Sequence, residues 1–217
     1  MYIWLQCSHG IRYNFNLGFD MSQAMENKGI IHMLSWHLEN IPRFNGASSF
    51  FSVAQHSVLC LKIIQELRLV NPGTNTSTIN LIDGNHHIAS TPRLYLHTLL
   101  HDAHEAILGD ITSPVEAALG SFCRAEIKQL KEKIQNDILV QFDILPPTQE
   151  ESNIIEIIDL MALWLEKENL FHKISMPWSI DMMELKPHVK DTLKGIETPA
   201  KHSWRKWVDY IMAGKLK

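Results

Sequence analysis

Apolar residues recur every three or four positions along most of this chain, and that spacing predicts amphipathic helices. The spacing extends over residues 21–40, 49–70, 92–109, 113–142, the segment that follows Thr148, and 199–214. We expect Gly29 to divide the first of these segments and Asn71-Pro72-Gly73 to end the second, because proline and glycine interrupt helices. The pattern therefore predicts a mainly helical protein.

Helix boundaries carry local signals of their own. Ser113-Pro114-Val115-Glu116 and Thr148-Gln149-Glu150-Glu151 both have the capping-box pattern, in which the first and fourth side chains bond to backbone groups at a helix start. The helix predicted over 92–109 is apolar almost all round and should be central. The last helix, which carries Trp204 and Trp207 at helical spacing, is expected to pack on the surface.

Two segments depart from the helical pattern. Residues 2–7 and 11–15 are rich in aromatic and β-branched side chains and flank a short turn that contains Gly10, as in a β-hairpin. We expect this hairpin to be the only sheet. Residues 74–90 are polar and rich in Thr and Asn, which predicts a surface loop or insertion. The predicted fold class is all-α, a helical bundle with a small N-terminal β-hairpin.

Composition narrows the functional classes. The 217 residues are 45% hydrophobic, enough for one core, so we expect a single domain over 1–217. The formal charge of -4 and the lack of a long basic block disfavour a nucleic-acid partner. Three scattered cysteines favour a reducing compartment, and the sequence has neither a membrane-length apolar run nor a secretion signal. We therefore expect a cytoplasmic protein with no membrane partner.

Candidate chemistry is concentrated in His101-Asp102-Ala103-His104-Glu105, directly after the apolar stretch 94–100. Such a polar cluster near a core is costly unless a partner satisfies it. On a helix, His101 and Glu105 lie one turn apart on one face, with Asp102 on a flank. The His-Glu-x-x-His order of zinc peptidases is absent, because Leu108 occupies its second histidine position. A metal here would need further ligands from other segments, because one helix cannot complete its coordination shell.

Two residues outside this cluster are candidates for those further ligands. His56 lies early in the helix predicted over 49–70, and Asp159 is embedded in an otherwise apolar stretch where an unpaired acid would be destabilising. Cys60 follows His56 by one turn and is interpreted as a small buried apolar residue, while His104 is expected to support the site without binding metal.

The ordered set of His56, His101-Asp102 and Asp159 resembles the H…HD…D signature of the HD-domain metal-dependent phosphohydrolases. The motifs Arg43-Phe44-Asn45-Gly46, Ser52-Val53-Ala54-Gln55-His56-Ser57 and Leu108-Gly109-Asp110-Ile111 are similar to those of bacterial HD-domain 5'-deoxynucleotidases and viral dATP triphosphohydrolases. The resemblance covers about residues 3–171, leaves 74–90 unmatched, and makes the helical tail after 171 an extension.

The resemblance implies a role for each matched residue. One divalent cation, Mn, Co, Zn or Fe with Mg as a further option, would be held by His56, His101, Asp102 and Asp159. Glu105 would accept or orient a proton of the attacking water, and Asp110 would lie near the substrate. Arg43 would contact the phosphate, for which a guanidinium offers paired hydrogen bonds. Phe44 replaces the tryptophan common in relatives, which keeps stacking but loses an indole N–H and leaves the base preference open.

The function predicted from these residues is hydrolysis of the 5' phosphate of a 2'-deoxynucleotide. Three alternatives stay open: release of triphosphate from a deoxynucleoside triphosphate such as dATP, a nucleotide-sensing HD module without turnover, and a helical nucleic-acid-binding protein. The resemblance also implies a homo-oligomer, a dimer or larger.

Overall fold

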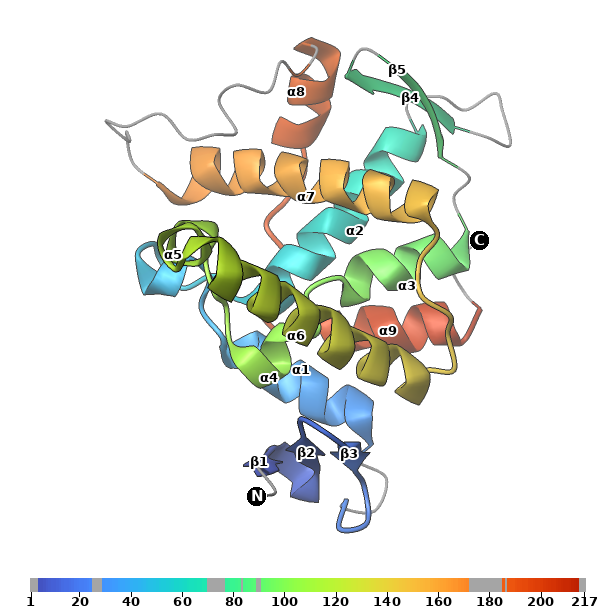
Figure 1. Ribbon diagram of the computed structural model, residues 1–217. Helices are drawn as coiled ribbons and strands as arrows, with labels where there is room; N and C mark the ends of the chain where they lie inside the picture. The colour runs from blue at the N-terminus through green and yellow to red at the C-terminus, as the bar shows by residue number, and fades with distance from the viewer. Residues whose placement is uncertain are drawn as a thin grey trace.

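The computed structural model describes residues 4–24, 29–69, 77–82, 84–88, 91–171, 185 and 187–214. Within these residues the chain is a bundle of α-helices with a small antiparallel sheet at its N-terminus, which confirms the predicted fold class (Figure 1). Helix α2 (Val53–Leu69) runs through the centre of the bundle and contacts helices from both halves of the chain. Most side chains of α2 are fully buried, as expected of a central helix.

The N-terminal sheet has one strand more than the predicted hairpin. Strands β1 (Trp4–Gln6) and β2 (Arg12–Asn14) pair around the short turn at 8–10, and β3 (Gly18–Asp20) adds to β2. The Asn14 side chain accepts hydrogen bonds from the backbone N–H groups of Asn16 and Leu17, which closes the second turn.

The predicted helix over 21–40 is shorter in the structure. Residues 21–24 form a turn, residues 25–28 lie outside the described part of the chain, and α1 (Ile30–Asn40) begins directly after Gly29. The start of α1 directly after Gly29 is therefore consistent with the interruption expected at that residue.

The central helix predicted over 92–109 is interrupted, contrary to that prediction. Helix α3 (Pro92–Leu100) is capped by Thr91 and is followed by a tight turn and the single-turn helix α4 (Glu105–Leu108). In the turn the backbone N–H groups bond to the carbonyl three residues back instead of four, as between Ala103 and Leu100. Gln135 stabilises this arrangement, because its side chain donates to the Leu100 carbonyl (2.8 Å) and accepts the His104 N–H (3.2 Å).

The helix predicted over 113–142 is also divided. It consists of α5 (Ser113–Ala118) and α6 (Gly120–Gln141), which are separated where Gly120 adopts a φ of +81°, a conformation that suits glycine. The capping box predicted at Ser113 is not formed, because Thr112 occupies the cap position and makes no side-chain capping bond.

Helix α7 (Gln149–Leu170) begins as the sequence predicts. The Thr148 hydroxyl accepts the Glu151 N–H (3.2 Å) and the Glu151 carboxylate accepts the Thr148 N–H (2.7 Å), so the capping box is confirmed. Helix α7 crosses α2 and makes extensive contact with it (Figure 1).

The prediction of a loop over 74–90 is wrong. This segment contains strands β4 (Ser77–Ile82) and β5 (Gly84–Ile88), which pair as a second antiparallel hairpin at the end of the bundle opposite the N-terminal sheet (Figure 1). The expectation of a single sheet fails for the same reason. The sequence does carry the signal, because Ile79, Leu81 and Ile82 precede an Asp-Gly pair typical of hairpin turns.

The C-terminal part of the chain adds α8 (Pro187–Lys194) and α9 (Trp204–Met212). Helix α9 was expected on the surface, yet it packs against α1, α2 and α3 and buries Trp204 completely. The Trp204 indole N–H donates to the Leu99 carbonyl (3.0 Å), so its polar group is satisfied inside the core. None of the helices in the described ranges is long and apolar enough to cross a membrane.

Candidate metal centre

Four predicted ligands from distant parts of the sequence meet between α2, α7 and the turn that follows α3. His56 Nε2 lies 2.9 Å from Asp159 Oδ1 and 3.6 Å from Asp102 Oδ2. His101 Nε2 lies 3.2 Å from Asp102 Oδ2, 3.3 Å from His56 Nε2 and 4.0 Å from Asp159 Oδ1. The structure thus brings together all four side chains that the sequence singled out.

These separations fit donors that share one cation. Nitrogen and oxygen ligands lie about 2.0–2.2 Å from zinc and similar ions, so neighbouring donors are separated by about 3.0–3.6 Å and opposite donors by about 4.2 Å. The observed distances of 2.9–3.6 Å match neighbouring donors, and the 4.0 Å distance from His101 to Asp159 approaches that of opposite donors. The cluster could therefore hold a metal ion.

Both imidazoles are oriented for ligation by a hydrogen bond on the far side of the ring. His101 Nδ1 lies 2.8 Å from the Thr98 carbonyl, which can only accept, so the proton is on Nδ1. His56 Nδ1 lies 2.6 Å from Glu166 Oε1, a carboxylate that likewise accepts. In each neutral ring the Nε2 lone pair then faces the cluster, which is the arrangement that metal-binding histidines need.

The charges in the cluster depend strongly on one another. Burial and the Arg43 charge lower the pKa of His56, but Cys60, Glu166 and Asp159 together raise it above its usual value. Burial also lowers the pKa of His101, but Asp102 outweighs that effect and raises it. Burial raises the pKa values of Asp102 and Asp159, but the imidazoles outweigh it and lower both. The cluster therefore favours a positive charge between these atoms, whether a proton or a metal cation supplies it.

Glu105 lies at the start of α4, close to the presumed ligand Asp102, and is only 6% exposed. Its carboxylate is within 4.8 Å of ligand atoms of Asp102 and His104. Its Oε2 has no hydrogen-bond partner among the residues that the structure describes. Burial, followed by the charges of Asp102 and Asp110, raises the pKa of Glu105 well above its usual value. Glu105 is thus a buried group that readily holds a proton next to the cluster.

Arg43 also lies next to the cluster. Its guanidinium lies 3.5 Å from Asp102 Oδ2 and 3.3 Å from Glu166 Oε2, and its side chain is only 12% exposed. The charge of Glu166 is the main factor that raises the pKa of Arg43 against the opposing effect of burial. A permanent positive charge is therefore held next to the presumed ligand Asp102.

The backbone beside Arg43 is strained. Phe44 has a φ of +56°, a left-handed conformation that is unusual for a large side chain and costs about 1–3 kcal/mol. Asp110 Oδ2 accepts the Phe44 N–H (3.2 Å), and the Phe44 ring packs edge-to-face on Phe171 with centroids 5.1 Å apart. These contacts place Asp110 and Phe44 at the same edge of the cluster as Arg43. Burial raises the pKa of Asp110.

Glu166 is a site residue that the sequence analysis missed. Its side chain is 1% exposed, and its two oxygens bridge His56 and Arg43. Glu166 follows Asp159 by seven residues, so the two acids lie two helical turns apart on nearly the same face of α7. That spacing, in a helix already assigned one ligand, is the signal that would have identified it.

The sulfur of Cys60 also lies next to the cluster. The interpretation of Cys60 as a small apolar core residue does not account for this position. Its Sγ lies 3.6 Å from His56 Nε2, and its ligand atom is within 4.8 Å of those of His56, His101 and Asp159. Burial raises the pKa of the Cys60 thiol to about 11.

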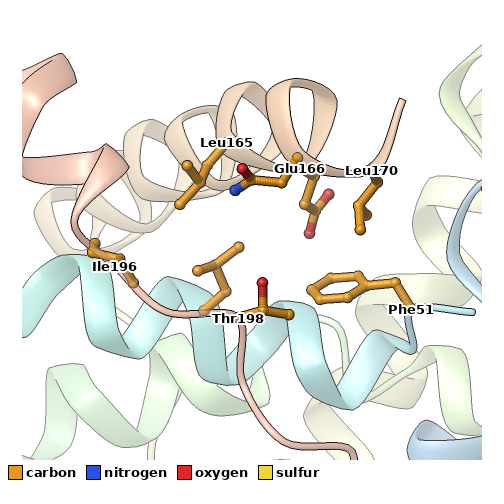
Figure 2. Close-up of a pocket in the computed structure, with 8 residues that line it drawn as sticks. Phe51, Leu165, Glu166, Leu170, Ile196 and Thr198 are labelled. Carbon is orange, nitrogen blue, oxygen red and sulfur yellow. The ribbon is translucent and has the colours of Figure 1, made fainter. Parts of the chain in front are cut away.

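A small pocket adjoins the centre between α2 and α7. It is lined by Phe51, Leu59, Leu165, Glu166, Asn169, Leu170, Ile196 and Thr198. Figure 2 shows the Glu166 carboxylate pointing from α7 towards the side where Phe51 and Thr198 lie. Because most of the lining is apolar, Glu166 is in a weakly polar environment, which strengthens its interactions with His56 and Arg43.

The fold and the cluster define an α-helical protein with a candidate metal centre. No protein-family model matches the chain. The chain is 29% identical over 142 residues to the uncharacterized protein YfdR of Escherichia coli (strain K12), and the matched part is 65% of this chain and 61% of that protein. The chain thus spans about three fifths of the length of this relative, whose name states no activity.

Proposed function

We propose that this protein is a divalent-metal-dependent phosphohydrolase of the HD type, which cleaves the 5' phosphate from 2'-deoxynucleotides. The observation that supports this most is the meeting of two imidazoles and two carboxylates from segments far apart in the sequence, in which the two imidazoles are 3.3 Å apart and each lies within 4.0 Å of both carboxylates. The resemblance of the motifs around these residues to deoxynucleotide phosphohydrolases supports the substrate class.

The donor set suits Mn, Fe, Co or Zn better than calcium, because imidazole nitrogen accounts for half of it. When bound, such an ion lowers the pKa of water and polarises a phosphoryl oxygen. The histidines have Nδ1 fixed by Thr98 and Glu166, so their Nε2 atoms are positioned before any ion binds.

Glu105 is proposed to take the proton of the attacking water. Its carboxylate lies within 4.8 Å of a ligand atom of Asp102, and its Oε2 lacks a partner in the described part of the chain, so this oxygen is available for the proton when the group is ionised. Asp110, which lies two residues after the end of the short helix α4, is proposed to position the ester through the backbone of Phe44.

Arg43 is proposed to bind the phosphate. Asp102 and Glu166 fix its guanidinium at the edge of the cluster, where a phosphate next to the ligands would meet its positive charge. The Phe44 ring, which lies 5.3 Å from the Arg43 guanidinium carbon, is proposed to stack on the sugar or base.

The test is a product-resolved assay of the purified protein with Mn²⁺, using dAMP and dATP as substrates. We expect phosphate release from dAMP and a loss of about 10²–10⁴-fold in Glu105→Gln, in which the carboxylate is replaced by an amide that cannot act as a base. Glu116→Gln, on helix α5, is the matched control and should retain activity.

The other outcomes of this assay separate the alternatives. Triphosphate release from dATP, detected by chromatography, would identify a triphosphohydrolase instead of a 5'-nucleotidase. Deoxynucleotide binding with no turnover under Mn, Co, Zn, Fe or Mg would indicate a sensing module. The absence of both binding and turnover would contradict the proposed function.

A further inference from the structure

The geometry points to a second ligand set in the same centre, in which Cys60 binds a thiophilic cation such as Zn²⁺ together with His56, His101 and Asp159. This set contains two nitrogens, one sulfur and one oxygen, and it replaces Asp102 with the thiol. The inference concerns metal binding alone and does not depend on the hydrolytic activity proposed above.

The position of the sulfur carries the inference. Bonds of about 2.3 Å from zinc to sulfur and about 2.1 Å from zinc to nitrogen place the two donors about 3.6 Å apart in a tetrahedral site. Cys60 Sγ and His56 Nε2 are 3.6 Å apart. The ligand atoms of His56, Cys60, His101 and Asp159 all lie within 4.8 Å of one another, so one ion can reach all four after small side-chain adjustments.

The backbone supports the same set. Cys60 follows His56 by one turn of α2, so both side chains project from one face of a rigid, buried helix. Asp159 comes from α7, which crosses and packs against α2, and His101 follows directly after α3, a helix that also contacts α2. All three backbone segments are therefore held by the core.

Asp102 has another partner when it is not a ligand. Its Oδ2 lies 3.5 Å from the Arg43 guanidinium, so the carboxylate can stay paired without the ion. A hard cation such as Mg²⁺ or Mn²⁺ prefers the two carboxylates, whereas a soft ion prefers the sulfur. Binding to sulfur releases the thiol proton to the solvent as the metal–sulfur bond forms. A tetrahedral shell made of four protein ligands leaves no open position, as in structural zinc sites.

The wild-type protein tests this inference directly by X-ray absorption at the zinc edge, on protein loaded with one equivalent of Zn²⁺. We expect one sulfur scatterer at about 2.3 Å together with nitrogen and oxygen scatterers. A shell of nitrogen and oxygen alone would overturn the inference. This measurement uses neither a substrate nor a variant, so its outcome is separate from that of the activity assay.

Substitution of the cysteine supplies the second test. With Co²⁺, the wild-type protein should show a thiolate-to-cobalt charge-transfer band in the near ultraviolet, and Cys60→Ser should lose it. Zn²⁺ affinity, measured against a chromophoric chelator, should fall by at least about tenfold in Cys60→Ser, while Mn²⁺ affinity changes by less than about twofold.

Cys7→Ser is the matched control, because Cys7 is also a buried free thiol but lies in the N-terminal part of the chain. It should keep the cobalt band and the Zn²⁺ affinity of the wild type. A cobalt band that survives in Cys60→Ser, or an equal loss in Cys7→Ser, would overturn the assignment. If Cys60→Ser does not fold, as judged by circular dichroism, the zinc-edge spectrum of the wild type decides.

Discussion

Two fully buried residues of this bundle lie in regions of opposite chemistry. Trp204 on α9 and His56 on α2 both have no exposed surface. The region around Trp204 removes apolar area from water, and its one polar atom is satisfied by a backbone carbonyl. The region around His56 places two imidazoles, three carboxylates and a guanidinium in contact.

The difference concerns what each region needs in order to be stable. Apolar packing stabilises the fold without any ligand, whereas taking charges out of water is repaid only when their pairing is nearly complete. In the His56 region the pKa of His56 is raised and that of Asp102 is lowered, so the region favours positive charge beside its carboxylates, and a bound cation would supply it. We therefore expect the first region to set the stability of the fold and the second to couple stability to metal.

Trp204→Ala should have the largest effect on stability. Truncating a fully buried tryptophan costs about 3–5 kcal/mol of unfolding free energy, because it leaves a cavity and an unpaired Leu99 carbonyl. Urea denaturation monitored by far-ultraviolet circular dichroism measures this loss. Trp207→Ala, at a partly buried position on the same helix, should cost less. Equal losses for the two variants would show that α9 does not pack as described.

Asp159→Asn should remove the response to metal. At a cation concentration 100 times the dissociation constant, the wild-type protein gains about 2.7 kcal/mol of stability. The amide in the variant carries no negative charge to bind the cation, so we expect its stability to rise by less than about 1 kcal/mol at the same concentration. Thermal unfolding with and without Mn²⁺ makes the comparison. A variant that gains as much as the wild type would remove Asp159 from the ligand set.

Glu166→Gln should weaken metal binding without abolishing it. Loss of a carboxylate that orients a ligating histidine typically lowers metal affinity by about 10–100-fold. Isothermal titration with Mn²⁺ measures the change. Glu168→Gln, at an exposed position of the same helix, is the control and should bind as the wild type does. Equal affinities in all three proteins would mean that the 2.6 Å contact between His56 and Glu166 has no role in binding.

The smallest effect is expected from pH at His97, which is buried away from the presumed ligands. Burial lowers its pKa, so the unfolded chain takes up a proton at a higher pH than the folded chain does. The resulting stability is fully present above about pH 6.5 and is lost as the pH falls through the lowered pKa of the folded state. In His97→Met, unfolding free energies at pH 7.5 and 5.5, measured with a chelator present, should differ less than in the wild type. An unchanged difference would contradict this assignment.

The sequence predicted the helical class because apolar residues recur at helical spacing along the chain. It predicted that four side chains meet because their order along the chain resembles a known metal-binding signature. Helical spacing identified the buried faces of α2 and α7, and the position of Asp159 in an apolar stretch indicated that it needed a partner. The capping box at Thr148 was found because all of its groups lie within four residues.

The features that the sequence did not predict depend on contacts between distant segments. The break after α3 is stabilised by Gln135, which lies 31 residues from His104, and local propensity gives no sign of it. The burial of α9 depends on a surface formed by α1 and α3. Glu166 follows Asp159 by two helical turns, and this signal is weak because exposed acids on ordinary amphipathic helices share it; its contacts with His56 and Arg43 show that it belongs to the site.

The central claim is that His56, His101, Asp102 and Asp159 hold one divalent cation. Crystals grown with Mn²⁺ and measured for anomalous scattering test this most directly. The account predicts one strong anomalous peak about 2.0–2.3 Å from a nitrogen or oxygen of each of these side chains. A peak elsewhere, or none between α2 and α7 at a saturating Mn²⁺ concentration, would contradict it.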